Sequence, residues 1–186
     1  MERPNLIHLA QDIWRQPEAV VRQVVEYDPW FGQKEILLIL AGVSGLLALP
    51  SGLDMMLLEI VLNLIVQVVT IYSMAWLLWI TGKPLGGKAT IAELCAAMVW
   101  PMIPAIWGTL FTIPLLNVEP WEIIVQGVFY LYSFHIMVHT VAEVQAFSKW
   151  RSFWNQLLAL ILSLLPFLYF WRDISAAINN LTSLHF

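Results

Sequence analysis

The chain has 186 residues, of which 60% are hydrophobic and only 12% are charged. Such a composition is far from that of a soluble domain and indicates an integral membrane protein. The formal net charge of −4 argues against a nucleic-acid partner. The single cysteine, Cys95, has no partner within the chain, so no internal disulfide is expected.

Residues 1–32 are rich in charge and contain no apolar core of a cleavable signal. We predict two short amphipathic helices separated at Pro17, a residue that suits the first position of the second helix. The apolar stripe of that helix would consist of four valines: Val20, Val21, Val24 and Val25. The segment is therefore expected to lie on the cytoplasmic surface of the membrane.

Five stretches approach the length of about 20 mostly apolar residues that a bilayer-crossing helix requires. They cover residues 33–50, 56–80, 92–114, 121–144 and 153–172. The predicted fold is an all-α integral membrane protein with a five-span domain over 33–172. Residues 173–186 would form a short tail on the outer side. Eight of the nine basic residues fall in the N-terminal segment and in alternate loops, which predicts a cytoplasmic N-terminus.

The loop "GKPLGGKAT" after the second stretch contains part of a phosphate-binding pattern. However, Ala89 stands where a magnesium-binding Ser or Thr is required, and the loop follows a membrane helix instead of a strand. We therefore predict no bound nucleotide. A turn followed by a capping box of Thr90 and Glu93 fits the pattern better. The alternative is that Lys83 and Lys88 hold a lipid phosphate.

Polar residues recur within the second stretch, where Glu59, Asn63 and Gln67 are spaced at i, i+4 and i+8. This spacing places them on one helical face. Because polar side chains are costly in lipid, that face is expected to contact protein or water.

A similar stripe in the fourth stretch consists of His135, His139 and Glu143. Three interpretations stay open: a metal site that needs a further ligand such as Glu93 or Cys95, a proton or ion path, or hydrogen bonds between packed helices, which we favour. We expect His135 to bond Gln67 at the same depth.

Pro101 and Pro104 interrupt the third stretch. A proline inside a helix removes a backbone hydrogen bond and bends the axis. A broken helix that lines a transport cavity is the alternative, but the sequence contains no matching break in another stretch. A bent packing helix is therefore predicted.

The segments "QPEAVVRQVVEYDPWFG" and "GKPLGGKATIAELCAAMVWPMIPAI", with the five-span plan, resemble the Yip-domain family of Ypt/Rab-interacting-type membrane proteins. Eukaryotic members have an Asp-Leu-Tyr-Gly-Pro motif before the first span. In this sequence Asp28, Pro29 and Gly32 have a different spacing, so Rab binding is not carried over.

The resemblance implies a non-enzymatic membrane adaptor or accessory subunit, of the kind found in bacterial inner membranes. It supplies no catalytic residues and no cofactor. The partners that it implies are membrane lipids and other membrane proteins, or a second copy of the chain. The alternative is a small transporter or channel that uses the two polar stripes.

Overall fold

The computed structural model describes residues 3–111 and 121–165, and every regular element in these ranges is helical. The seven labelled α-helices are α1 (Leu6–Asp12), α2 (Pro17–Tyr27), α3 (Gln33–Leu46), α4 (Leu53–Gly82), α5 (Ile91–Val99), α6 (Met102–Leu110) and α7 (Glu122–Gln145). Two short 3-10 helices, η1 (Leu49–Ser51) and η2 (Lys83–Leu85), flank α4. Residues 149–165 form a further helix.

The two predicted N-terminal helices are confirmed, and Pro17 is the first residue of α2. The side chain of Asn5 caps α1 by accepting the backbone N–H of Ile7 at 3.0 Å. Val20, Val21 and Val24 of α2 are buried, and α2 packs against α5 and α7. The apolar stripe of α2 is therefore covered by protein, and the placement of this segment on the cytoplasmic surface of the membrane stays a prediction.

Within residues 3–111 and 121–165, three helical segments are long and apolar enough to cross a membrane: Leu53–Leu85, Ile91–Leu110 and Ile123–Gln145. The prediction of five crossings is not confirmed. The first predicted span corresponds to α3, which has 14 residues. At a rise of about 1.5 Å per residue, such a helix is roughly 21 Å long, less than the hydrocarbon core of about 30 Å.

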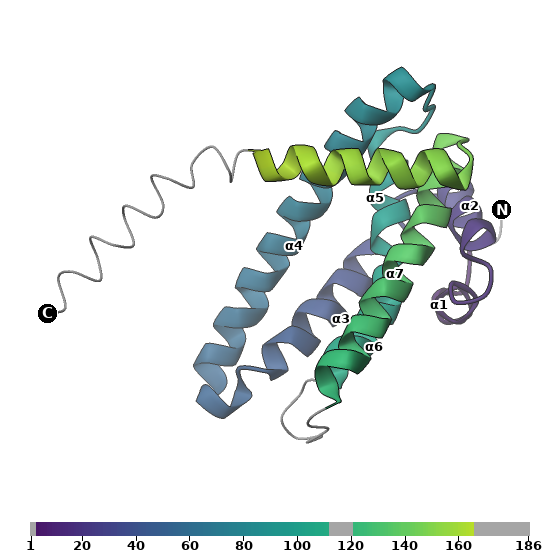
Figure 1. The fold of residues 1–186 in the computed structure, drawn as a ribbon. Helices are drawn as coiled ribbons and strands as arrows, with labels where there is room; N and C mark the ends of the chain where they lie inside the picture. Colours follow the sequence, from purple (N-terminus) through teal and green to yellow (C-terminus); the bar gives the residue numbers. More distant parts are fainter. Residues whose placement is uncertain (1–2, 112–120, 166–186) are drawn as a thin grey trace, which may run out of the picture.

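The fifth predicted span, 153–172, is described only as far as residue 165. This part of the chain belongs to the yellow-green helix of Figure 1, which runs across α4 and α7 instead of alongside them. The remainder of that span and the predicted tail 173–186 lie outside the described residues.

The segment formed by α5 and α6 lies in the interior of the bundle. In its most apolar 18-residue window 72% of the residues are buried, against 6% in the corresponding window of α4. Trp100 is fully buried at the junction of the two helices, and its indole N–H donates to the carbonyl of Phe31 at 3.3 Å. This bond ties the interior helix to the connection between α2 and α3.

The predicted bend lies at Pro101, which separates α5 from α6. Because proline has no N–H, the helix cannot bond the carbonyl of Ala97 four residues earlier. The hydroxyl of Thr140 in α7 donates to that carbonyl at 2.7 Å. The interruption therefore joins two helices, which supports the interpretation as a packing bend.

Candidate functional site

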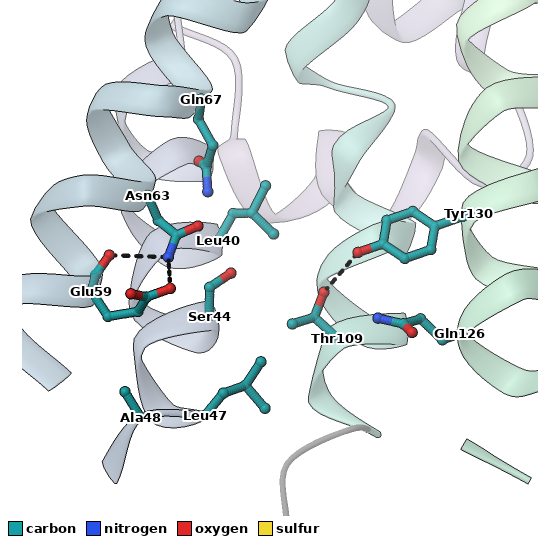
Figure 2. A pocket seen from close by; sticks show the side chains of 10 residues that line it. All are labelled: Leu40, Ser44, Leu47, Ala48, Glu59, Asn63, Gln67, Thr109, Gln126 and Tyr130. Atoms are coloured by element: carbon teal, nitrogen blue, oxygen red, sulfur yellow. Dashed lines mark hydrogen bonds between the residues drawn. The ribbon is translucent and has the colours of Figure 1, made fainter. Parts of the chain in front are cut away.

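The polar stripe of α4 borders a hollow of about 530 Å³ between α3, α4, α6 and α7 (Figure 2). We call this space the polar hollow. Its polar lining consists of Ser44, Glu59, Asn63, Gln67, Thr109, Gln126 and Tyr130. The residues come from four helices, so the predicted stripe faces protein across a gap.

On the α4 side of the hollow, the side-chain hydrogen bonds of the stripe join residues of α4 to each other. The amide nitrogen of Asn63 donates to the carboxylate of Glu59 at 2.8 Å and to its backbone carbonyl at 3.0 Å. The side-chain oxygen of Gln67 is buried and has no hydrogen-bond partner within the described ranges. On the opposite side, the hydroxyls of Thr109 and Tyr130 are 3.5 Å apart. The α4 side thus offers oxygen acceptors to the hollow.

His135 does not reach Gln67, so the predicted hydrogen bond between them is wrong. His135 borders a separate hollow of about 500 Å³ beside the α1–α2 connection, where Trp14 and Tyr132 also lie. Its ring centroid is 4.6 Å from that of His139 and 6.3 Å from that of Tyr132. Equal depth did not make the two side chains neighbours, because this face of α7 is directed to the N-terminal segment.

Charged and polar residues near the C-terminal end of α7 hold α2 against the bundle. Glu18 accepts from Nδ1 of His139 at 2.8 Å and from the ammonium of Lys149 at 3.0 Å. Arg22 pairs with Glu143 at 2.7 Å. These five residues form what we call the α2 clamp. Hydrogen bonds from Lys149 and His139 hold the pKa of Glu18 below its usual value.

The structure does not assemble the metal site that was one interpretation of the histidine stripe. Within residues 3–111 and 121–165, no group of three or more His, Cys, Asp or Glu is arranged to hold a metal ion. Glu143 pairs with Arg22, and Cys95 is fully buried in the apolar core. Glu93 forms the predicted capping box with Thr90, which is confirmed.

The glycines of the loop "GKPLGGKAT" lie against a side chain of α7, and a lipid phosphate at Lys83 and Lys88 stays a prediction. A Cβ at Gly82 would lie 2.5 Å from the amide nitrogen of Gln145, and a Cβ at Gly87 would overlap the amide oxygen. The backbone N–H of Lys88 donates to the carbonyl of Gln145 at 3.4 Å. Lys83 lies over the ring of Trp79, at 5.3 Å from the centroid. Close approach to Gln145 explains the two glycines.

Sequence reasoning missed a set of buried polar residues near this loop. Gln145 and Asn155 both donate to the carbonyl of Leu78, at 3.2 Å and 3.3 Å. Ser152 and Gln156 donate to α7 carbonyls at 2.8 Å and 3.1 Å. The signal was present, since Ser152, Asn155 and Gln156 are spaced at i, i+3 and i+4 on one helical face. This spacing marks the face of the helix 149–165 that crosses α4 and α7.

Comparison with protein-family models gives a match to the Yip1 domain over residues 12–170. The chain belongs to the Yip1 domain family. The match covers both the α2 clamp and the polar hollow, as well as the two segments that carried the resemblance. No curated protein and no solved structure matches the chain. The family assignment therefore supports a membrane protein with roles of the vesicle-trafficking type, without indicating a partner.

Proposed function

We propose that this Yip1-domain protein is a non-enzymatic adaptor or accessory subunit of a bacterial inner membrane, acting through protein and lipid contacts. The observation that carries the proposal is the α2 clamp. It holds an N-terminal helix against the bundle by side-chain bonds to α7 and Lys149, while the polar face of α2 stays exposed. A helix held in this way presents a fixed, charged surface to a partner.

Site-specific photo-crosslinking in native membranes tests the adaptor role. A photoreactive amino acid in place of Gln23, exposed on α2, is expected to give a discrete protein adduct. The matched control is the same residue in place of Leu57, exposed on the apolar surface of α4, which is expected to give lipid adducts. Lipid adducts alone at both positions would contradict the proposal.

The orientation with a cytoplasmic N-terminus is part of the same proposal and rests on the distribution of basic residues. Gly52 and Gly86 lie at opposite ends of α4. A cysteine in place of Gly86 is expected to react only with reagents that reach the cytoplasm, and one in place of Gly52 only with external reagents. Labelling of both from one side would contradict the topology.

The polar hollow supports a second candidate function, a small transporter or channel. Its buried acceptor on Gln67 and the carboxylate of Glu59 are features that solute pathways use. Reconstitution in liposomes with proton- and ion-sensitive dyes distinguishes this function from an adaptor. A flux that disappears in Glu59→Gln and persists in Asp54→Asn, a charge change elsewhere on α4, would establish it; no flux above that of empty liposomes would refute it.

A further inference from the structure

An apolar cavity of about 250 Å³ adjoins the polar hollow. The two spaces share Leu40 and Tyr130 in their linings. The apolar cavity is lined mainly by apolar groups of Met98, Pro101, Met102, Ala105, Phe134 and Met137. The combined space thus has a polar part near the start of α7 and an adjoining apolar part about two turns further along.

We propose that this space binds one membrane lipid, with a primary ammonium head group in the polar hollow and an acyl chain in the apolar cavity. The proposal does not depend on the adaptor role, because no residue of the α2 clamp lines either space. An amphiphile is the ligand class that matches a polar and an apolar space in contact.

The positions of the lining residues fit the dimensions of one bilayer leaflet. From Gln126 to Met137 in α7, and from Thr109 back to Met98 in the interior segment, the separation is 11 residues. At about 1.5 Å per residue this is roughly 16 Å. Half of the hydrocarbon core is about 15 Å thick. The ends of α3 and α6 and the start of α7 lie at the same end of the bundle (Figure 1), and the lining residues Leu47, Thr109 and Gln126 place the polar hollow beside them, where a head group would enter.

The side chains of α4 that line the hollow favour a cation that can also donate hydrogen bonds. The carboxylate of Glu59 and the unbonded side-chain oxygen of Gln67 are acceptors on one helical face. A primary ammonium has a positive charge and three N–H donors, so it can pair with the carboxylate of Glu59 and still donate to a further acceptor of the hollow. A quaternary ammonium has the charge without donors, and an anionic head group without an amine is repelled by Glu59.

The opposite side of the hollow suits the phosphate of a zwitterionic lipid. Figure 2 shows Gln126 and Tyr130 reaching into the hollow from α7, across from the α4 stripe. Their amide and hydroxyl groups can donate hydrogen bonds to phosphate oxygens. The hydroxyl of Ser133, next in depth, is buried and has no partner among the described residues. An ester carbonyl of the lipid would accept from it, as unsatisfied buried polar groups are rare.

Native mass spectrometry of the full chain in neutral detergent tests the head-group specificity. The protein is titrated with phosphatidylethanolamine, phosphatidylcholine and phosphatidylglycerol that have identical acyl chains. We expect the ethanolamine lipid to bind about tenfold more tightly than either competitor, because only it places N–H donors beside Glu59. Equal retention of all three lipids would overturn the assignment.

Two variants locate the bound lipid. Glu59→Gln keeps the shape of the side chain and removes its charge, so the preference for ethanolamine lipid is expected to disappear. Asp54→Asn makes the same change at the start of α4, outside both spaces, and is expected to keep the preference. Preference retained in Glu59→Gln, or lost equally in both variants, would overturn the site.

The apolar part has its own test, which does not alter the head-group site. Ala105→Leu fills part of the apolar cavity and is expected to weaken binding of the lipid at least severalfold while the unfolding midpoint stays within the range of the other variants. Free ethanolamine in millimolar excess is expected not to compete. Competition by free ethanolamine would show that the site takes small amines and would overturn the lipid assignment. Unchanged lipid binding in a folded Ala105→Leu protein would show that the acyl chain does not occupy the apolar cavity, and would overturn the assignment as well.

Discussion

The two ends of the helical bundle differ in how their buried polar side chains are hydrogen-bonded. At the end that carries α1 and α2, side chains form hydrogen bonds between helices. The carbonyls of Leu78, Ala97 and Val138 each accept one from a helix other than their own. At the end that contains the polar hollow, Asn63 bonds only within its own helix, and Gln67 keeps a buried oxygen without a partner in the described part of the chain. Polar groups at the first end hold helices together, whereas Asn63 and Gln67 of the α4 stripe form no hydrogen bond to another helix within the described residues.

The largest effect is expected from Trp100→Ala, which truncates a large, fully buried side chain. Trp100 is fully buried and bonded to Phe31, so truncation should lower the free energy of unfolding by about 3–5 kcal/mol. Trp107→Ala is the matched control, since Trp107 is 51% exposed, and its cost should be small. Chemical unfolding in detergent, followed by circular dichroism, measures both. Equal costs would show that the burial of Trp100 does not contribute to the stability of the fold.

Gly87→Ala should be the next most costly change, because the new methyl group would overlap the buried amide of Gln145. Overpacking of this kind costs about 1–3 kcal/mol. Combining it with Gln145→Ala removes the clashing amide, so the double variant should be less destabilised than the sum of the single changes. Strict additivity in this double-mutant cycle would contradict the explanation of the loop glycines.

The contrast between the two ends also shows what could be predicted from the sequence. The capping box of Thr90 and Glu93 and the helix start at Pro17 depend on a few neighbouring residues, and both are confirmed. The contact between His135 and Gln67 depended on which helices are neighbours. Depth along a helix does not determine its rotation, so that prediction was wrong.

Buried amides were missed for a related reason. Gln145 and Asn155 lie at the ends of apolar stretches, where hydropathy cannot distinguish an exposed amide from one that bonds a carbonyl of another helix. Both donate to Leu78, 67 and 77 residues away in sequence. Only the crossing of the helix 149–165 over α4 and α7 brings these groups together, and that crossing was not predicted.

A smaller effect is expected from Glu18→Gln in the α2 clamp. Because the pKa of Glu18 in the folded protein lies below its usual value of 4.5, its contribution to stability is present above that pH. It is lost as the pH falls through the folded pKa. Glu18 is 39% exposed, so the substitution should cost less than about 1 kcal/mol at neutral pH.

The pH profile of unfolding separates the clamp from a general effect of charge. The difference between wild type and Glu18→Gln should be constant at neutral pH and shrink as the pH falls below 4.5. Glu26→Gln, on the exposed side of the same helix, should show no such convergence. A difference between wild type and Glu18→Gln that grows on acidification would contradict the assigned direction of the pKa.

The smallest effect is expected at Gln67, and it is compared with the same substitution at Gln145. Gln145 is 1% exposed and donates to Leu78, so Gln145→Met removes a buried hydrogen bond and should cost about 1–3 kcal/mol. Gln67→Met removes an oxygen that is already without a partner among the described residues, so the free energy of unfolding should change by less than about 0.5 kcal/mol. Both are measured in lipid-free neutral detergent, where no head group occupies the hollow. If Gln67→Met lowered the free energy of unfolding as much as Gln145→Met, the side chain of Gln67 would be bonded within the lipid-free protein. The polar stripe would then serve to stabilise the fold, which would contradict the contrast between the two ends.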